Sequence, residues 1–248
     1  MVDPQAPLIA LVTNCTTYGG PGSASGLVAA GHRVFCHDRS FASDEAREQW
    51  SAAHPGAEAL AEHDPAALVD TVIAKAGRID AVVSNDVVTA DREGFAASTA
   101  EQFDAMIVDG MMFPYRLAHR ALQNMVPRGS GALVFITSAA ARMPTAGAVL
   151  YSAVRGGTTA MAIALGRAYG KQGIAVNAVG PSWFDNAAYF PEGWAERSPQ
   201  RAEFFEKHAT LDRLGTQDEM GRLVAFLCEQ RAMPVTAQYI DFSGNSPP

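Results

Sequence analysis

Three side chains near the middle of the sequence could act together in a proton transfer. Ser138 precedes Tyr151 by thirteen residues, and Arg155 follows Tyr151 by four. Because an α-helix repeats about every 3.6 residues, Tyr151 and Arg155 share one face if this segment is helical. A free phenol has a pKa of about 10, so Tyr151 needs a neighbouring cation to serve as a base near neutral pH. Arg155 supplies a cation that stays protonated under all working conditions.

Taken one at a time, these residues have ordinary structural explanations. Serine and tyrosine often only cap or pack, and an arginine on a helix is usually solvated surface. Their combination is more specific, because Ser138 closes a predicted strand and Tyr151 opens a predicted helix. Both side chains then converge at the carboxyl edge of a sheet, where open α/β sheets bind their ligands. We therefore predict a catalytic site of Ser138, Tyr151 and Arg155.

The elements that would position this site alternate between strand and helix. Short runs rich in Val, Ile and Ala predict buried parallel strands, and longer runs with helical spacing lie between them. This alternation predicts an α/β fold, a single Rossmann-like doubly wound parallel sheet with helices on both faces, in one domain over residues 1–248. The predicted strands cover residues 7–14, 32–38, 79–86, 131–138, 173–181 and 233–242, and the predicted helices 65–77, 101–126, 159–173 and 219–229.

The alternating pattern breaks between residues 181 and 213. This segment holds two Trp, four Phe, a Tyr and two Pro after its first residue. An insertion after the carboxyl end of a strand lies where open sheets bind ligands. We interpret residues 181–213 as a lid and pocket wall inserted in the domain.

The turn after the first strand lacks the glycines that a dinucleotide requires. Only glycine lets the backbone approach a pyrophosphate closely at the helix N-terminus. One such glycine-rich loop has the pattern T-G-x-x-x-G-x-G. When this pattern is aligned at Thr13, Asn14 and Tyr18 occupy two of its glycine positions, and only its last glycine is present, as Gly20. The Tyr18 side chain would project into the volume of the cofactor, so we predict no nicotinamide cofactor.

Asp38 points the other way. It ends the second predicted strand, where an acidic residue would bind the ribose of NAD. The competing explanation is a strand-end carboxylate, and the sequence leaves both open.

Composition excludes several classes of function. Hydrophobic residues make up 48% of the 248 residues and charged residues 18%, which is ordinary for a globular protein. The net charge is -7 and the 19 Lys and Arg are dispersed, so no basic face for nucleic acid is expected. No apolar run is long enough for a membrane span, and the N-terminus lacks the pattern of a signal peptide. We expect a cytoplasmic protein that binds neither nucleic acid nor membrane.

The metal-binding residue types show no ligand spacing. Cys15, Cys36 and Cys228 are odd in number and far apart in apolar contexts, which predicts buried free thiols. The six histidines form no H-x-x-x-H pattern, so we predict no metal site.

A family resemblance rests on two features of the sequence: the arginine at position 155 and the missing glycines after the first strand. Nearly the whole chain resembles the short-chain dehydrogenases/reductases and, within them, the halohydrin dehalogenases. These carry S-x12-Y-x3-R where the dehydrogenases have lysine, and T-x4-F/Y-x-G where those have the glycine loop. Both patterns stand here, as Ser138, Tyr151 and Arg155 and as Thr13, Tyr18 and Gly20.

The resemblance implies dehalogenation without a cofactor. Phenolate from Tyr151 takes the proton of a vicinal hydroxyl held by Ser138, and the oxygen displaces halide to give an epoxide. The reverse reaction opens an epoxide with a small anion such as azide, cyanide or nitrite. Small haloalcohols, epoxides and anions are therefore the expected partners, and the superfamily resemblance implies a homotetramer. The small-residue helix after Tyr151 offers a face for that contact, with packing on the sheet as the alternative.

The resemblance also assigns roles around the triad. The halide loop begins at Pro181, and the expected halide-binding residues are Tyr18, Pro181, Ser182, Trp183 and Phe184; Trp183 and Phe184 could instead be apolar lid residues. Asp86 is expected to orient Arg155 by a charge-assisted pair, with a strand-end cap as the alternative. The substrate pocket is expected to involve Tyr189, Phe190 and Trp194.

Two other functions stay open at this point. Asp38 and the fold would suit a divergent NAD-dependent oxidoreductase. A catalytically silent binding protein on the same scaffold would not need the intact triad.

Overall fold

The computed structural model describes residues 6–88, 94–144, 146–209, 211–229 and 234–244. The predicted absence of a signal peptide rests partly on residues 1–5, which lie outside these ranges, as do residue 210 of the predicted lid and Met233 of the last predicted strand.

Within the described ranges, seven strands form one parallel sheet in the order β3-β2-β1-β4-β5-β6-β7. They are β1 (Ile9–Val12), β2 (Arg33–Cys36), β3 (Ala57–Ala59), β4 (Ala81–Asn85), β5 (Gly131–Ile136), β6 (Ile174–Pro181) and β7 (Gln238–Phe242). All six predicted strands are confirmed with shorter bounds. The prediction missed β3, which has three half-buried residues at the sheet edge and therefore no continuous apolar run.

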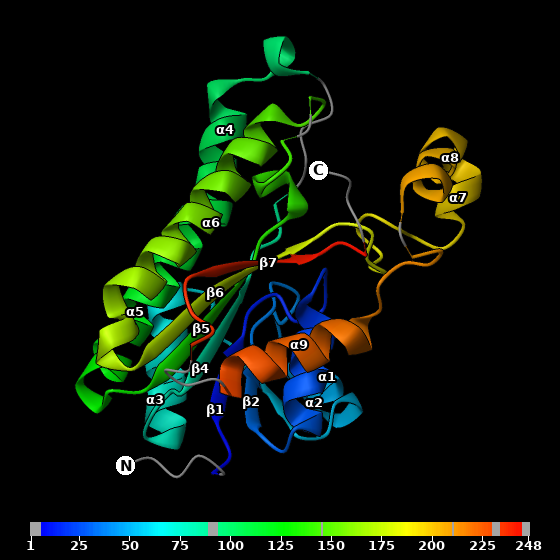
Figure 1. Ribbon diagram of the computed structural model, residues 1–248. Coiled ribbons are helices and arrows are strands. Elements are labelled where there is room, and N and C mark those ends of the chain that lie inside the picture. Colours follow the sequence, from blue (N-terminus) through cyan, green and yellow to red (C-terminus); the bar gives the residue numbers. More distant parts are fainter. Residues whose placement is uncertain (1–5, 89–93, 145, 210, 230–233, 245–248) are drawn as a thin grey trace.

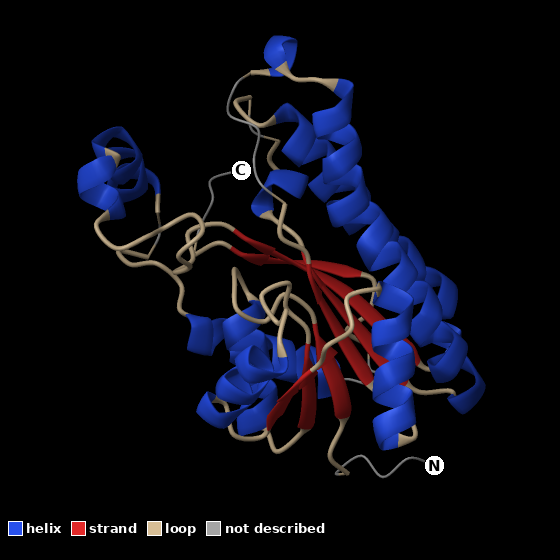
Figure 2. Cartoon of the chain, turned by 180° about the vertical axis from the view of Figure 1, so that it is seen from behind, coloured by secondary structure: helices blue, strands red, loops and turns tan. Residues whose placement is uncertain are grey.

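Helices cover both faces of this sheet (Figure 1). The view from behind shows the same central strands between two helical layers (Figure 2). One layer holds α1 (Gly20–Ala29), α2 (Asp44–Ala53) and α9 (Gln217–Glu229); the other holds α3 (Pro65–Ala76), α4 (Ala100–Ile107), α5 (Phe113–Arg128) and α6 (Val149–Tyr169). The predicted doubly wound sheet is confirmed. The short helices α7 (Trp194–Arg197) and α8 (Pro199–His208) stand away from both layers.

Each face of the sheet has its own apolar core. On the α1 and α9 side, Leu27, Met220 and Val224 pack on the β1 residue Val12 and its neighbours. A second cluster on the opposite side joins α3 and α5 to the other face of the strands. Since both faces are covered, every residue of β5 is buried, which explains why its sequence is a continuous apolar run.

The predicted long helix over residues 101–126 is interrupted by a π-helical turn, Val108–Met112, between α4 and α5. Gly110 in this turn packs so closely on Val154 of α6 that an added Cβ would lie 2.4 Å from Val154 Cγ1. The Thr158 hydroxyl of α6 donates to the Gly110 carbonyl. The turn thus sets the approach of α6, the helix that carries Tyr151 and Arg155.

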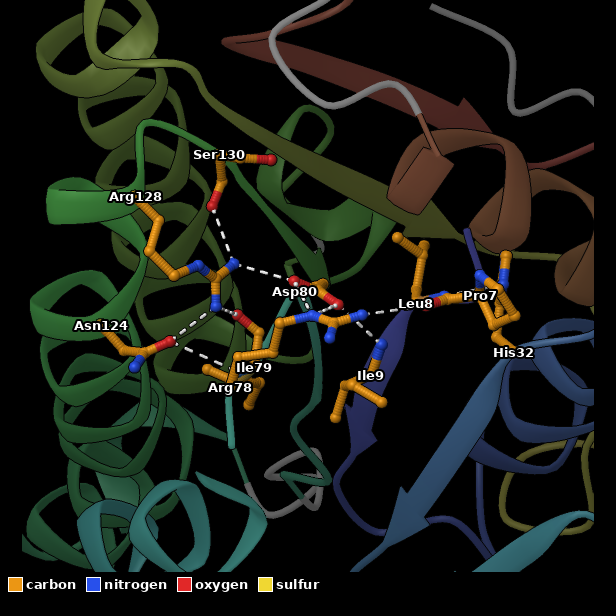
Figure 3. Close-up of polar contacts among 10 residues, drawn as sticks. All are labelled: Pro7, Leu8, Ile9, His32, Arg78, Ile79, Asp80, Asn124, Arg128 and Ser130. Carbon is orange, nitrogen blue, oxygen red and sulfur yellow. Dashed lines mark hydrogen bonds and ion pairs between the residues drawn. The ribbon is translucent and has the colours of Figure 1, made fainter. Parts of the chain in front are cut away.

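At the amino end of the sheet, Asp80 is a buried charged anchor (Figure 3). Its Oδ2 accepts from the Ile9 backbone N–H and the Arg78 Nε, both at 2.9 Å, and its Oδ1 accepts from the Arg128 Nη2 at 2.8 Å. These contacts tie β1, β4 and the end of α5 together. They lie at the edge opposite the predicted site, so they hold the scaffold without touching the chemistry.

The described helices include none with the length and apolar character that a membrane crossing requires. The three cysteines are buried free thiols, as predicted. No cluster of potential metal ligands was found among the described residues.

Candidate active site

The carboxyl end of the sheet brings the three predicted catalytic residues together. Ser138 follows β5 by two residues and is buried, with its Oγ accepting from the Ala140 backbone N–H at 3.1 Å. Tyr151 and Arg155 lie one turn apart near the start of α6, and both are buried. The side chains of Ser138 and Arg155 lie close enough to Tyr151 to lower its pKa. The three residues whose spacing suggested a common site thus lie together in the structure.

This cluster favours the ionised form of Tyr151. Burial alone raises the pKa of Tyr151, but the charge of Arg155 and the hydrogen bonds from Ser138, Tyr189 and Arg155 outweigh it, so that the pKa lies below its usual value. The Arg155 Cζ lies 5.1 Å from the centroid of the Tyr151 ring. A phenol with a lowered pKa beside a permanent cation can serve as a general base.

Arg155 is held by backbone carbonyls. Its Nη2 donates to the Asp86 carbonyl at 2.7 Å and its Nη1 to the Ile136 carbonyl at 3.5 Å. The expected hydrogen-bonded pair with the Asp86 carboxylate is absent in this geometry, and Asp86 Oδ1 instead accepts from the Ser84 hydroxyl at 2.9 Å. Asp86 Oδ2 and Arg155 Nε have no hydrogen-bond partner among the described residues.

The charge of Arg155 nevertheless affects the pKa of the Asp86 carboxyl. Its burial raises its pKa to about 7, and the charge of Arg155 and the Ser84 hydrogen bond lower it only in part. Asp86 is thus a strand-end carboxyl that hydrogen bonds to its own strand and influences Arg155 through space, which combines the two alternatives that the sequence left open.

Tyr18 stands over the same arginine in a strained backbone conformation. Its φ is 52° and that of Asn14 is 47°, so both residues adopt the left-handed conformation that glycine prefers. These are the two positions where the sequence has replaced glycine. The Tyr18 hydroxyl donates to the Thr137 carbonyl at 3.0 Å, and its ring centroid lies 5.7 Å from the Arg155 Cζ. Side-chain contacts therefore hold a backbone shape that glycine would adopt freely.

The N-terminus of α1 does not fit a dinucleotide. The N–H groups that a pyrophosphate would use are bonded inside the protein. That of Gly19 donates to Asn85 Oδ1 at 3.3 Å, that of Gly20 to the Thr17 carbonyl at 2.9 Å and that of Gly22 to Gln217 Oε1 at 2.8 Å.

Asp38 is also fully engaged. Its Oδ2 accepts from the Thr16 backbone and hydroxyl at 3.1 and 2.7 Å. Its Oδ1 accepts from the backbone and hydroxyl of Ser40 at 2.9 and 2.7 Å. This carboxylate is a strand-end clamp on the loop that carries Tyr18, and it has no lone pair directed at a ribose.

The expected halide-binding residues divide between two clusters. Phe184 is buried in the same core as Tyr18, and their rings meet edge to face at a centroid distance of 6.3 Å. Trp183 instead packs with Phe190 and Phe205 in a separate aromatic cluster. Consecutive side chains in an extended segment point to opposite sides, so only Phe184 of this pair faces Tyr18.

Pro181 and Ser182 contribute backbone to this region. Pro181 ends β6 opposite Phe242 of β7. The Ser182 N–H donates to the Phe242 carbonyl at 3.2 Å, so it is not free to bind a halide.

The expected pocket residues also divide. Phe190 and Trp194 belong to the aromatic cluster around Trp183, and their ring centroids lie 5.1 Å apart. Tyr189 packs against this cluster too, but it also reaches the Tyr18 side, where its ring lies 5.7 Å from that of Tyr18 and its hydroxyl interacts with Tyr151. The structure thus adds Tyr189 to the residues around the predicted base.

Gln217 is a connecting residue that the sequence analysis missed. Besides accepting from Gly22, its Nε2 donates to the carbonyls of Tyr18 at 2.8 Å and Asp185 at 2.9 Å. It therefore ties the Tyr18 loop to the segment after β6. A signal was present: Thr216 and Glu219 form a reciprocal capping pair, which starts α9 at Gln217 rather than at the predicted Glu219.

By sequence, the chain resembles reductases. A sequence model of the family described as Enoyl-(Acyl carrier protein) reductase matches residues 20–244. A putative ketoacyl reductase of the monensin polyketide synthase from Streptomyces virginiae is 29% identical and covers 95% of both chains.

Two solved structures resemble the chain over almost its full length. One is a "Dehalogenation enzyme" with a TM-score of 0.90, 30% identity and coverage of 98% of this chain and 99% of that chain. The other is a halohydrin dehalogenase (HheC) bound to ethyl (2S)-oxiran-2-ylacetate, with a TM-score of 0.91, 33% identity and coverage of 96% and 97%.

Proposed function

Because this chain belongs to the halohydrin dehalogenases, within the short-chain dehydrogenase/reductase superfamily, we propose that it converts vicinal haloalcohols to epoxides without a cofactor. One observation carries this proposal. The side chain of Tyr18 fills the volume beside Arg155 from a backbone position that suits glycine. The Tyr18 ring therefore occupies the side of the catalytic residues where a nicotinamide could otherwise bind.

The proposed reaction is an internal displacement. The phenolate of Tyr151 removes the proton of a substrate hydroxyl that Ser138 holds by a hydrogen bond. The C–O bond to the neighbouring carbon forms while the carbon–halogen bond breaks, so the halide leaves with the bonding electron pair. The proton remains on Tyr151 and passes to solvent before the next turnover. In reverse, azide, cyanide or nitrite opens an epoxide and Tyr151 donates the proton.

Arg155 makes this cycle possible near neutral pH. It supports the phenolate by its charge and by a hydrogen bond, and its own position is fixed by the Asp86 and Ile136 carbonyls. Guanidinium has no accessible deprotonated form, so this support does not vary with pH. We propose Ser138, Tyr151 and Arg155 as the catalytic residues.

The halide would leave toward Tyr18 and Phe184. Aromatic ring edges carry partial positive charge and form a site of modest polarity. Both side chains are buried, which keeps bulk water away from the anion. We propose residues 181–213 as the lid of this site, with Pro181 and Ser182 shaping its start and Trp183, Phe190 and Trp194 stabilising it from within.

A halide-release assay on a panel of small haloalcohols, run with and without NAD, tests the proposal. We expect halide release and acidification in the absence of NAD, and no release by a folded Tyr151→Phe variant. Saturable binding of NADH would instead support an oxidoreductase. A folded wild-type protein that turns over no haloalcohol or epoxide would favour a binding protein on this scaffold.

We further propose a cytoplasmic homotetramer. The exposed face of α6 supports this, because Ala160, Ile163, Ala164, Arg167 and Ala168 line a shallow surface groove there. Small side chains let a helix of another subunit approach closely. The mass of the protein in solution checks this assembly.

A further inference from the structure

Tyr189 approaches the predicted base from the segment after β6. Asn186 fixes its backbone, because the Tyr189 N–H lies 3.0 Å from Asn186 Oδ1. The Tyr189 ring meets the Tyr18 ring nearly edge to face, at an interplanar angle of 70°. Its hydroxyl donates to the carbonyl of Val88, just beyond β4, at 3.0 Å. Tyr189 therefore bridges three loops at the carboxyl edge of the sheet.

The same hydroxyl also lies close enough to Tyr151 to interact with it, and Arg155 lies close to both phenols. The Tyr189 oxygen thus has two acceptors within reach, the Val88 carbonyl and the Tyr151 oxygen, but only one proton to donate.

We propose, on the basis of the proposed dehalogenase activity, that Tyr189 is a positioning residue for the base. The Tyr189 hydroxyl donates to the Val88 carbonyl while Tyr151 is protonated, and it donates to Tyr151 instead when that residue is a phenolate. A hydrogen bond to a charged acceptor is stronger than one to a neutral carbonyl. Tyr189 therefore stabilises the ionised form of Tyr151 selectively. The ionisation of Tyr151 then depends on the position of residues 186–190.

The other groups around Tyr151 are not placed to change their hydrogen-bond acceptor when Tyr151 ionises. Ser138 approaches Tyr151 from the end of β5, and Arg155 approaches it from α6 itself. Tyr18 is committed to the Thr137 carbonyl, and Tyr239 of β7 donates to the Ser138 carbonyl at 3.3 Å. Among the described residues, the charged groups nearby include Asp86, which bonds Ser84, and Asp109, which acts on Asp86; Arg142 and Asp241 act on Tyr239.

The ionisation order of the phenols agrees with this role. Burial and the neighbouring Tyr151 raise the pKa of Tyr189 above its usual value. Burial likewise raises the pKa of Tyr18. Tyr151 is therefore the first of the three to lose its proton, and Tyr189 still has one to donate.

The pH dependence of kcat/KM for haloalcohol conversion tests the role in catalysis. In Tyr189→Phe the ring stays in contact with Tyr18 and only the hydroxyl is lost. We expect the acid limb to move up by about one pH unit, which is a tenfold loss of rate below that limb. Phe205→Leu, which loosens the aromatic cluster without removing a hydroxyl, should change KM and leave the limb in place. An unmoved limb in Tyr189→Phe, or an equal shift in Phe205→Leu, would overturn the proposal.

A spectroscopic titration separates this proposal from the activity itself. The ultraviolet difference absorbance of tyrosinate reports ionisation without any substrate, and Tyr151→Phe identifies the signal of the first tyrosine to ionise. That signal should move to higher pH in Tyr189→Phe. If it moves while no haloalcohol is converted, the positioning role stands and the proposed function fails; if it does not move in an active enzyme, the positioning role fails alone.

Discussion

Nη2 of Arg155 donates to the backbone carbonyl of Asp86 at 2.7 Å, while the Asp86 carboxyl turns back to Ser84. A main-chain acceptor cannot titrate, so the position of the guanidinium does not depend on the charge of Asp86. The carboxyl still acts through space on the arginine that supports Tyr151. The backbone carbonyl of Asp86 thus helps to position Arg155, whereas the side-chain carboxyl of Asp86 affects the electrostatics around it.

Asp86→Asn should flatten the dependence of stability on pH. The pKa of Asp86 is raised to about 7 from the ordinary value of 3.8, so between these values the native chain binds more protons than the unfolded chain. Stability is therefore lost as the pH rises through that window, by at most about 4 kcal/mol for this group. Asparagine can still accept from Ser84 and carries no charge. Urea unfolding of both proteins near the two ends of the window measures the difference; parallel slopes would contradict the prediction.

Arg155→Lys should lower the rate at least tenfold and add an alkaline limb to the pH profile. A lysine cannot reach the Asp86 carbonyl and both phenols with a planar fork, and burial lowers its pKa so that it can lose its charge. Steady-state rates over a pH series measure this, with Arg155→Met as the control that has no charge at any pH. A profile for the lysine variant that matches the wild type would show that Arg155 does not tune Tyr151.

Tyr18→Phe and Tyr18→Gly should have different effects. The phenylalanine leaves the buried Thr137 carbonyl without its donor, at a cost of about 1–3 kcal/mol, and keeps the aromatic wall. The glycine relieves the left-handed φ, worth about 1–2 kcal/mol, but loses a buried ring whose removal costs about 3–5 kcal/mol. Unfolding free energies and product inhibition by bromide test both. We expect inhibition to persist in Tyr18→Phe and to weaken in Tyr18→Gly.

Phe184→Leu should weaken halide inhibition severalfold, and Trp183→Leu should not. Phe184 faces Tyr18, while Trp183 lies in the cluster with Phe190 and Phe205. Trp183→Leu should raise KM instead, because it loosens residues 181–213. Inhibition constants for chloride and bromide in both variants distinguish the two sides of this segment. The reverse order would place the halide beside Trp183.

Asp80→Ala should destabilise the protein by about 1–3 kcal/mol, because it leaves the buried Ile9 N–H without an acceptor and removes the anion that Arg78 and Arg128 share. The network lies at the amino edge of the sheet, so the kcat of the folded fraction should stay at the wild-type value. Denaturant unfolding and active-site titration check the two halves of this statement. A change in kcat would mean that strain at this edge reaches the site.

The sequence by itself determined the sheet and the predicted catalytic triad. Strands buried on both faces read as continuous apolar runs, and the spacing of Tyr151 and Arg155 fixes one helix face whatever surrounds it. The edge strand β3 escaped because it is short and half-buried. The replaced glycines also indicated the right loop, since backbone shape there depends on local residue type.

Only the tertiary structure decided how the side chains around that triad are used. Asp38 could have faced a ribose, yet Thr16 and Ser40 take both of its oxygens. Gln217 lies 199 residues from Tyr18 and still bonds its carbonyl. Such contacts depend on which loops meet at the carboxyl edge and on where each side chain points after a turn. Neither is encoded in local periodicity, so the direction of Tyr189 toward Tyr151 could be found only in the folded chain.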